Sequence, residues 1–214
     1  IWISVDDHAP DLIALSDRVW GMPEICYTEY ASVAEHTALL REKGFRVTGN
    51  VAGIPTAVVG EAGDSGPIIA FLGEYDALPG LCQEAGVAEP RPLPGHGQGH
   101  GCGHNLLGSA ALLAACALKD WLAETGTPGR VRYYGCPAEE GGAAKSFMAR
   151  AGAFDGVAAA ITWHPHCFNE VAPALSLANT RMDFAFTGRA SHAAAAPHLG
   201  RSALDAAQLM CTGV

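Results

Sequence analysis

Apolar residues recur at helical spacing near the start of the chain. Leu12, Leu15 and Val19 form one stripe, which predicts a helix over residues 7–20 that ends before Gly21. The same pattern, with stop signals such as glycine, recurs further along the chain. It predicts helices over 28–43, 105–125, 141–151 and 202–210.

Short apolar runs between these helices predict strands. The segment 67–73, PIIAFLG, is apolar at nearly every position, which is typical of a strand buried on both faces. We read 158–163 as another buried strand. The full set of expected strands in this part of the chain is 45–51, 56–60, 67–73, 129–135 and 158–163. Because helices and strands alternate, the sequence predicts an α/β fold with a mostly parallel sheet flanked by helices.

The pattern changes after Pro173. Met182, Phe184 and Phe186 alternate with other residues, which predicts a half-exposed strand over 177–187. Alternation of this kind is typical of an antiparallel sheet. We therefore expect one domain over residues 1–172 and the start of a small α+β domain over 173–214.

The composition and net charge of the chain limit the kinds of partner that it is expected to bind. The chain has 214 residues, of which 49% are hydrophobic and 16% charged, and its net charge is −9. An acidic chain of this kind is a poor partner for a nucleic acid backbone. We find no apolar run near the ~20 residues that span a bilayer, so no membrane is expected as a partner. Acidic residues at the start do not suit a signal peptide. Seven scattered cysteines indicate reduced thiols and a cytoplasmic location.

One loop concentrates potential metal ligands. Residues 95–105 read GHGQGHGCGHN, in which glycine at every second position allows close backbone approach. The potential ligands in it are His96, His100, Cys102 and His104. The alternative is a flexible loop that binds no metal, since composition alone is weak evidence.

Further potential ligands follow the predicted strands. They are Glu74 and Asp76 after 67–73, Glu139 and Glu140 after 129–135, and His164 and His166 after 158–163. Because ligands bind at the carboxyl ends of strands in open α/β sheets, we expect these side chains to converge. Thiolate, imidazole and carboxylate together favour zinc or a similar first-row ion.

The paired glutamates indicate a division of labour. One of Glu139 and Glu140 can bind metal while the other acts as a general base on water. The alternative is a solvated surface pair, which their position directly after a buried strand disfavours. A cysteine hydrolase using Cys102 and His104 is a further alternative, although no third, orienting group is evident.

Three motifs in order carry a family resemblance. They are Gly99-His-Gly-Cys-Gly-His-Asn105, Pro137-Ala-Glu-Glu-Gly-Gly142 and Trp163-His-Pro165. With them the chain resembles the M20 metallopeptidase and amidohydrolase family. The most similar part of that family is the branch of N-acyl amino acid and auxin-conjugate amidohydrolases, and within it the aminobenzoyl-glutamate hydrolase subgroup. Asn105, where most of the branch has Asp, is shared with that subgroup.

The resemblance implies a site for two divalent ions, zinc or manganese. Its metal ligands would be Cys102, His104, Glu140 and His164. Glu139 would be the general base, and Asp76 would orient a ligand. His192, in the motif Gly188-Arg-Ala-Ser-His192, would stabilise the oxyanion and reach into the partner subunit. Glu74, where the branch often has Asp, receives no role, and His166 is the expected spare ligand.

The resemblance also implies the wider organisation. Residues 1–172 would be a catalytic domain whose C-terminal part, with one more metal-binding His, is absent, and 173–214 the beginning of a lid and dimerisation domain. The substrate would be a small N-acyl or N-aroyl amino acid or a dipeptide-like conjugate. The partner would be a second copy of the chain or a paralogous subunit. A truncated fragment that binds metal without turnover is the alternative.

Overall fold

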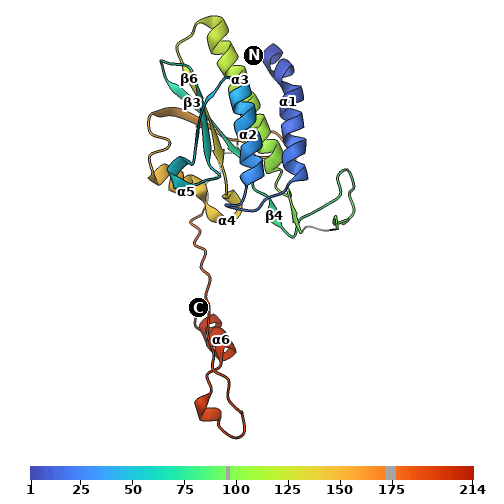
Figure 1. Ribbon diagram of the computed structural model, residues 1–214, viewed down its shortest axis with the longest axis vertical. Coiled ribbons are helices and arrows are strands. Elements are labelled where there is room, and N and C mark those ends of the chain that lie inside the picture. Colours follow the sequence, from blue (N-terminus) through green and yellow to red (C-terminus); the bar gives the residue numbers. More distant parts are fainter. Residues whose placement is uncertain (95–96, 172–176) are drawn as a thin grey trace. The chain divides into compact units, whose positions relative to one another are not determined.

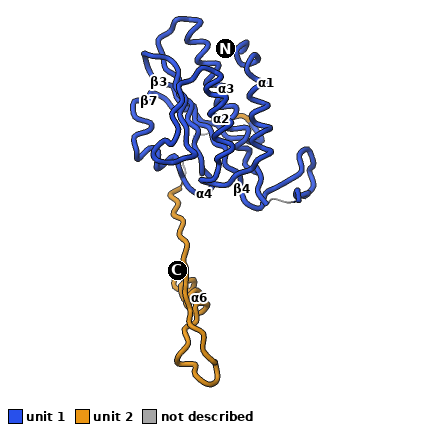
Figure 2. Tube along the Cα trace, viewed as in Figure 1, with its two compact units in different colours: residues 1–168 blue, residues 169–214 orange. Residues whose placement is uncertain are grey.

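The computed structural model describes residues 1–94, 97–171 and 177–214. The chain divides into two compact units, unit 1 at Ile1–Phe168 and unit 2 at Asn169–Val214 (Figure 2). The domain boundary predicted between residues 172 and 173 lies outside these described ranges.

A five-stranded sheet forms the centre of unit 1, with strand order β1-β2-β6-β3-β7. The strands are β1 (Arg46–Gly49), β2 (Val58–Ala62), β3 (Ile68–Glu74), β6 (Arg130–Cys136) and β7 (Val157–Ile161). β3 pairs in parallel with β6 and β7, whereas β2 pairs antiparallel with β1 and β6. The predicted α/β class is thus confirmed, in a mixed sheet whose parallel part is β6-β3-β7. A separate two-stranded ladder joins β4 (Leu78–Pro79) to β5 (Gln98–Gly99).

Helices flank this sheet in Figure 1. They are α1 (Trp2–Gly21), α2 (Tyr30–Glu42), α3 (His104–Thr125), α4 (Glu139–Gly142) and α5 (Ala144–Arg150), with the short 3₁₀ helix η1 at Val51–Gly53. Because side chains alternate along a strand, β6 contributes to two cores. Tyr133 packs with Leu15, Leu40 and Leu112 of α1, α2 and α3, and Tyr134 belongs to the core that includes Met148 of α5.

One helix within the described residues, α3, is long and apolar enough to cross a membrane, judged by length and composition alone. It has 22 residues and a mean hydropathy of 1.5. This corrects the expectation that no apolar segment approaches the length that spans a bilayer. Leu107, Leu112 and Ala115 of α3 are buried inside unit 1, where the helix packs against α1, β3 and β6. A helix in a protein core can have the same length and composition, so packing explains the apolar character of α3.

Two expectations about strands were wrong. β7 is mostly exposed rather than buried, because it lies at the edge of the sheet and pairs with β3 alone among the described strands. Residues 177–187 form no strand, and Met182 and Phe184 are 66% and 62% exposed. A strand needs a neighbour for its backbone groups, and the described part of unit 2 provides only an isolated bridge between Arg189 and Arg201.

The remaining elements of unit 2 are helical. The 3₁₀ helix η2 spans Pro197–Leu199, and α6 spans Ala203–Gly213. Ser202 caps α6, because its hydroxyl accepts a hydrogen bond from the Asp205 backbone N–H at 3.0 Å. The helix predicted over 202–210 is therefore present.

Candidate metal centre

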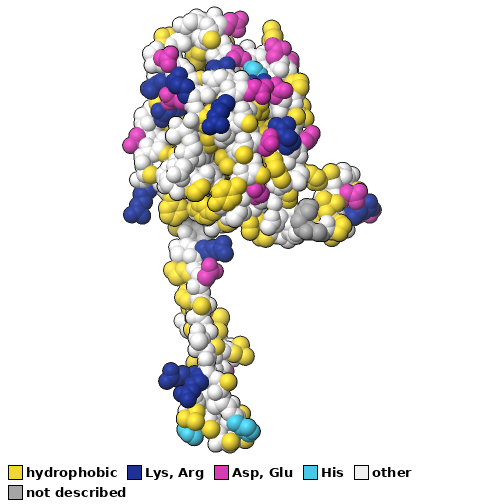
Figure 3. Space-filling model, in the orientation of Figure 1, with side chains coloured by type: hydrophobic (Ala, Val, Ile, Leu, Met, Phe, Trp, Pro, Cys, Tyr) yellow, Lys and Arg dark blue, Asp and Glu magenta, His cyan; other side chains and the backbone are white. Residues whose placement is uncertain are grey.

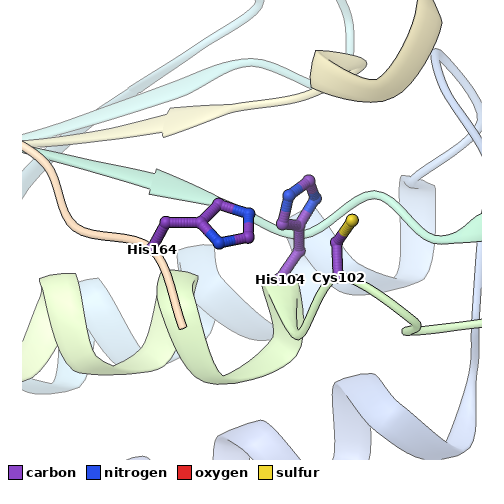
Figure 4. A group of neighbouring side chains, drawn as sticks. All are labelled: Cys102, His104 and His164. Carbon is purple, nitrogen blue, oxygen red and sulfur yellow. The ribbon is translucent and has the colours of Figure 1, made fainter. Parts of the chain in front are cut away.

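The carboxyl ends of β3, β6 and β7 bring the predicted ligands together with the start of α3. β3 and β6 run in register to their ends, where Glu74 lies opposite Cys136. Figure 4 shows His104 at the first turn of α3, Cys102 on the loop before it, and His164 on the segment after β7. The convergence expected from the strand ends is therefore present for Glu74, Asp76, Glu139, Glu140 and His164, but not for His166.

His104 lies at the middle of the cluster and is fully buried. Its Nδ1 lies 2.9 Å from the Asp76 carboxylate and 3.0 Å from the Asp76 carbonyl oxygen. Because both neighbours can only accept, Nδ1 carries a proton, and in the neutral ring Nε2 presents its lone pair. That lone pair faces three carboxylates, with Nε2 to oxygen distances of 3.1 Å to Glu74, 3.8 Å to Glu140 and 3.9 Å to Glu139.

Asp76 organises two parts of the site through one buried carboxylate. While Oδ1 accepts the His104 ring N–H, Oδ2 accepts the backbone N–H of Glu140 at 2.9 Å. The side chain of Asp76 is fully buried. It therefore fixes the orientation of a ligand ring and the position of the turn that carries both glutamates.

Two overlapping groups of side chains have the spacing that a metal ion requires. Cys102, His104 and His164 form one, and Glu74, His104 and Glu139 form the other, with the potential ligand atoms of each group within 4.8 Å of one another. The ring of His164 lies edge-on to that of His104, with centroids 5.7 Å apart. The Nδ1–H of His164 donates to the Pro165 carbonyl at 3.0 Å, which in the neutral ring leaves the lone pair on Nε2.

Orphaned polar atoms test whether a cation fits here. His104 Nε2, Glu74 Oε2 and Glu140 Oε1 are buried and have no hydrogen-bond partner among the described residues. A buried lone pair without a donor is costly, and three that face one another are more so. A divalent ion would satisfy all three, so the donor set fits the implied metal.

The pKa shifts reflect this surplus of negative charge. Burial alone would lower the pKa of His104, but the hydrogen bond and charge of Asp76, with Glu74 and Glu140, raise it. Burial and the charge of Glu74 raise the pKa of Glu139, against Lys145 and His104. Both effects favour proton uptake, which a bound cation would oppose.

The pKa of Cys102 is shifted in the direction opposite to the one that a nucleophilic cysteine requires. Glu140, followed by burial and the charge of Glu139, raises the pKa of Cys102 to about 11. A nucleophilic cysteine needs a lowered pKa. The cysteine hydrolase alternative is therefore disfavoured, while a metal would deprotonate the same thiol directly.

Two residues in this cluster were not assigned by the sequence. Glu74 reaches His104 Nε2, and its other oxygen forms an ion pair with Nζ of Lys145 on α5. The position of Glu74 at a strand end indicated a potential ligand, but the family resemblance gave it no role. No sequence signal indicated Lys145, because its contribution depends on how α5 packs.

The other histidines lie elsewhere. His166, the expected spare ligand, contacts Cys167 and Phe168 and belongs to neither group found among the described residues. The ring of His100 contacts the Val19 carbonyl at 3.1 Å. His96 lies outside the described residues.

His192 belongs to unit 2, whereas the cluster belongs to unit 1. Its Nδ1 accepts the backbone N–H groups of Ala194 and Ala195 at 3.2 and 3.1 Å. In the neutral ring the proton is therefore on Nε2, which is available to donate a hydrogen bond.

The chain matches one known family and several known proteins. The peptidase family M20/M25/M40 matches residues 70–210. The chain belongs to this family. It is 51% identical over 199 residues to a subunit of the p-aminobenzoyl-glutamate hydrolase of Escherichia coli, covering 93% of this chain and 41% of that protein. It is 34% identical to the Xaa-Arg dipeptidase of Mus musculus, covering 98% of this chain and 47% of that protein.

Solved structures agree on the fold. The YXEP protein of Bacillus subtilis, described as a dinuclear metal-binding peptidase of the M20 family, matches with a TM-score of 0.57 and 27% identity. The match covers 70% of this chain and 41% of that one. An aminobenzoyl-glutamate utilization protein of Klebsiella pneumoniae has a TM-score of 0.53 at 19% identity, covering 72% of this chain and 43% of that one. The family resemblance read from the motifs is confirmed, and this chain spans less than half the length of these relatives.

Proposed function

We propose that the protein containing this chain is a metal-dependent amidohydrolase. It cleaves the amide bond of N-acyl or N-aroyl amino acids, or of dipeptide-like conjugates, with aminobenzoyl-glutamate as the model substrate. The observation that carries this proposal is the buried His104, oriented by Asp76, whose lone pair faces three carboxylates. The substrate class is supported by the names of the relatives that are 51% and 34% identical.

Four residues would hold two divalent ions, zinc or manganese. They are Cys102, His104, Glu140 and His164, and the clustering of Cys102, His104 and His164 supports their joint role. Such ions supply Lewis acid polarisation of the substrate carbonyl and lower the pKa of water. Glu74, close to His104 Nε2, is a further candidate ligand.

Proton transfer is assigned to Glu139. Its pKa is raised by burial and by Glu74, which brings a carboxylate closer to the range in which it can accept and release a proton. Its side chain is 45% exposed, so water can reach it. Asp76 keeps His104 in the tautomer that presents Nε2 to a metal.

His192 would stabilise the developing oxyanion. The backbone N–H groups bound to its Nδ1 leave Nε2–H as a donor. We propose that it acts in the active site of a partner subunit, either a second copy of this chain or a paralogue. The paralogue is supported by two E. coli relatives, which are named as different subunits of p-aminobenzoyl-glutamate hydrolase.

Charge and compartment complete the proposal. Lys and Arg side chains are interspersed with Asp and Glu on the face of unit 1 drawn in Figure 3. No nucleic acid partner is proposed, because the net charge of the chain is −9. A cytoplasmic location suits a thiol ligand, because Cys102 must stay reduced to bind metal. A fragment that binds metal without turnover is not favoured, because the named relatives are hydrolases.

Glu139→Gln tests the proposal. The full-length, metal-loaded protein is expected to hydrolyse p-aminobenzoyl-glutamate, and the variant to lose about 100-fold or more in kcat with its metal content kept. Glu61→Gln is the matched control, because Glu61 pairs with arginines on β1 and β6 rather than with the cluster. Near-parental turnover by Glu139→Gln would refute the assigned base, and no hydrolysis by the parent would refute the function.

A further inference from the structure

The turn that carries Glu139 and Glu140 is held in a costly backbone conformation. Ala138, which precedes the pair, has φ of 54°, and Ala143, which follows α4, has φ of 51°. Both are in the left-handed region, where an alanine costs about 1 kcal/mol or more. Strain of this kind persists only where the surroundings impose it, so other residues must fix this turn.

Glu29 contacts the first residue of the turn. Its Oε1 accepts the backbone N–H of Ala138 at 2.8 Å, across 109 positions of sequence, and also the backbone N–H of Tyr27 at 2.9 Å. Glu29 is completely buried, and no basic side chain of the described residues forms an ion pair with it. Burial raises the pKa of Glu29, and this effect outweighs the hydrogen bonds from backbone N–H groups, which lower it.

Tyr27 contacts the last residue of α4. Its hydroxyl donates to the carbonyl of Gly142 at 2.6 Å. The ring is packed so closely that a Cβ on Gly142 would lie 2.4 Å from Tyr27 Cε2, which only glycine avoids. Tyr27 itself has φ of 62°, so the segment between α1 and α2 is also strained where it meets the turn.

The two contacts lie at opposite ends of the turn, and Asp76 contacts its middle. Glu29 binds the N–H of Ala138, Asp76 binds the N–H of Glu140, and Tyr27 binds the carbonyl of Gly142. None of these partners comes from the strand or helix next to the turn. The backbone of the turn is therefore fixed from outside at three points, which sets where both glutamate side chains begin.

We propose that Tyr27 and Glu29 are positioning residues that clamp the Glu139–Glu140 turn into the conformation needed for metal binding and proton transfer. We call the pair the turn clamp. This inference rests on the proposed function for its kinetic consequences. Its structural consequence, the placement of Glu140 as a ligand, is independent of the substrate. The clamp acts through hydrogen bonds to backbone atoms. The effect of Glu29 therefore depends on the position of its acceptor oxygen and not on its negative charge.

The test uses the full-length protein with three clamp variants: Glu29→Ala, Glu29→Gln and Tyr27→Phe. Co²⁺ is titrated in, with its visible absorption as the readout, and kcat and KM are measured with p-aminobenzoyl-glutamate. Glu29→Ala is expected to lower kcat about 10- to 100-fold with a smaller change in KM, because a misplaced catalytic group costs rate before binding. It is also expected to weaken Co²⁺ binding about tenfold or more and to change the spectrum.

The conservative variant separates positioning from charge. Glu29→Gln keeps an oxygen for the Ala138 N–H and is expected to restore the parental spectrum and most of kcat. Tyr27→Phe is expected to lose about three- to tenfold in kcat, the value of one hydrogen bond. Its control is Tyr134→Phe, which loses a hydroxyl that donates to the Ala153 carbonyl at 2.7 Å and accepts from Arg132, without a hydrogen bond to the turn, and should keep kcat.

Three outcomes overturn the turn clamp: a folded Glu29→Ala with parental spectrum and kcat, a Glu29→Gln as impaired as Glu29→Ala, or equal kcat losses in Tyr27→Phe and Tyr134→Phe. If Glu29→Ala fails to fold, the two tyrosine variants decide. A parent that binds Co²⁺ but hydrolyses no substrate refutes the proposed function, while the Co²⁺ readout still tests the clamp.

Discussion

Asp76→Asn should weaken metal binding although Asp76 need not touch the metal. The carboxylate accepts two N–H groups at 2.9 Å, one from the His104 ring and one from the Glu140 backbone, each on a separate oxygen. An amide offers only one acceptor oxygen. Its NH₂ group would face one of the two donors, so at least one hydrogen bond to a charged oxygen is lost.

The magnitude follows from the charge and burial of this contact. A hydrogen bond to a charged group contributes about 1.5–3 kcal/mol. Since about 1.4 kcal/mol is a factor of ten, metal affinity should fall roughly 10- to 100-fold. The fall should be in affinity rather than in stoichiometry, because the ligands themselves remain.

A competition titration of zinc against a chromophoric chelator measures this affinity. Asp120→Asn is the matched control, because Asp120 also binds a histidine ring nitrogen, His8 Nε2 at 2.8 Å, near the opposite end of α3. The reasoning is refuted if Asp76→Asn, shown to be folded by its unfolding transition, binds zinc as tightly as the parent does.

The remaining predictions concern packing, metal removal and acid stability. In Gly108→Ala the new Cβ would lie 2.4 Å from the Glu74 carbonyl, so chemical denaturation should show a loss of about 1–3 kcal/mol. Unchanged stability would contradict that close approach. A chelator should abolish hydrolysis and lower the Tm, and Cys102→Ser should weaken zinc binding more than manganese binding, since thiolate favours zinc. Burial opposes ionisation of Asp120, but hydrogen bonds from Lys119, Ser4 and His8 lower its pKa from 3.8 to about 2. That stability is present above pH 3.8 and is lost as pH falls toward 2, by about 1 kcal/mol for so exposed a group, and Asp120→Asn should lack this dependence in acid unfolding.

The sequence predicted the part of the site that depends on local order along the chain. Parallel strands end at one edge, so residues that directly follow β3, β6 and β7 had to meet there, and Asp76, Glu139 and His164 do lie at that edge. The helix at α3 was also evident, because its apolar positions are dense and its loop is rich in glycine. These inferences needed only periodicity and the geometry of a parallel sheet.

Inferences that depended on what covers a segment were less successful. The run at β7 was read as buried from its apolar residues, yet four of its five positions are exposed at the sheet edge. The alternating residues of 177–187 suited a strand, yet none forms there, since pairing requires a second strand. Periodicity reports which face a residue would present, whereas burial depends on a neighbour that the pattern does not identify.

The contacts that hold the site together were the hardest to foresee, and the turn clamp shows why. Glu29 and Ala138 are 109 positions apart, and their contact joins a side chain to a backbone N–H. Backbone groups are the same in every residue, so nothing in the identity of Ala138 indicates a partner. A buried carboxylate without a cation becomes informative only when the fold shows that the groups it satisfies belong to a strained turn. Residue types thus largely indicate which side chains are metal ligands, while packing sets the positions of those side chains.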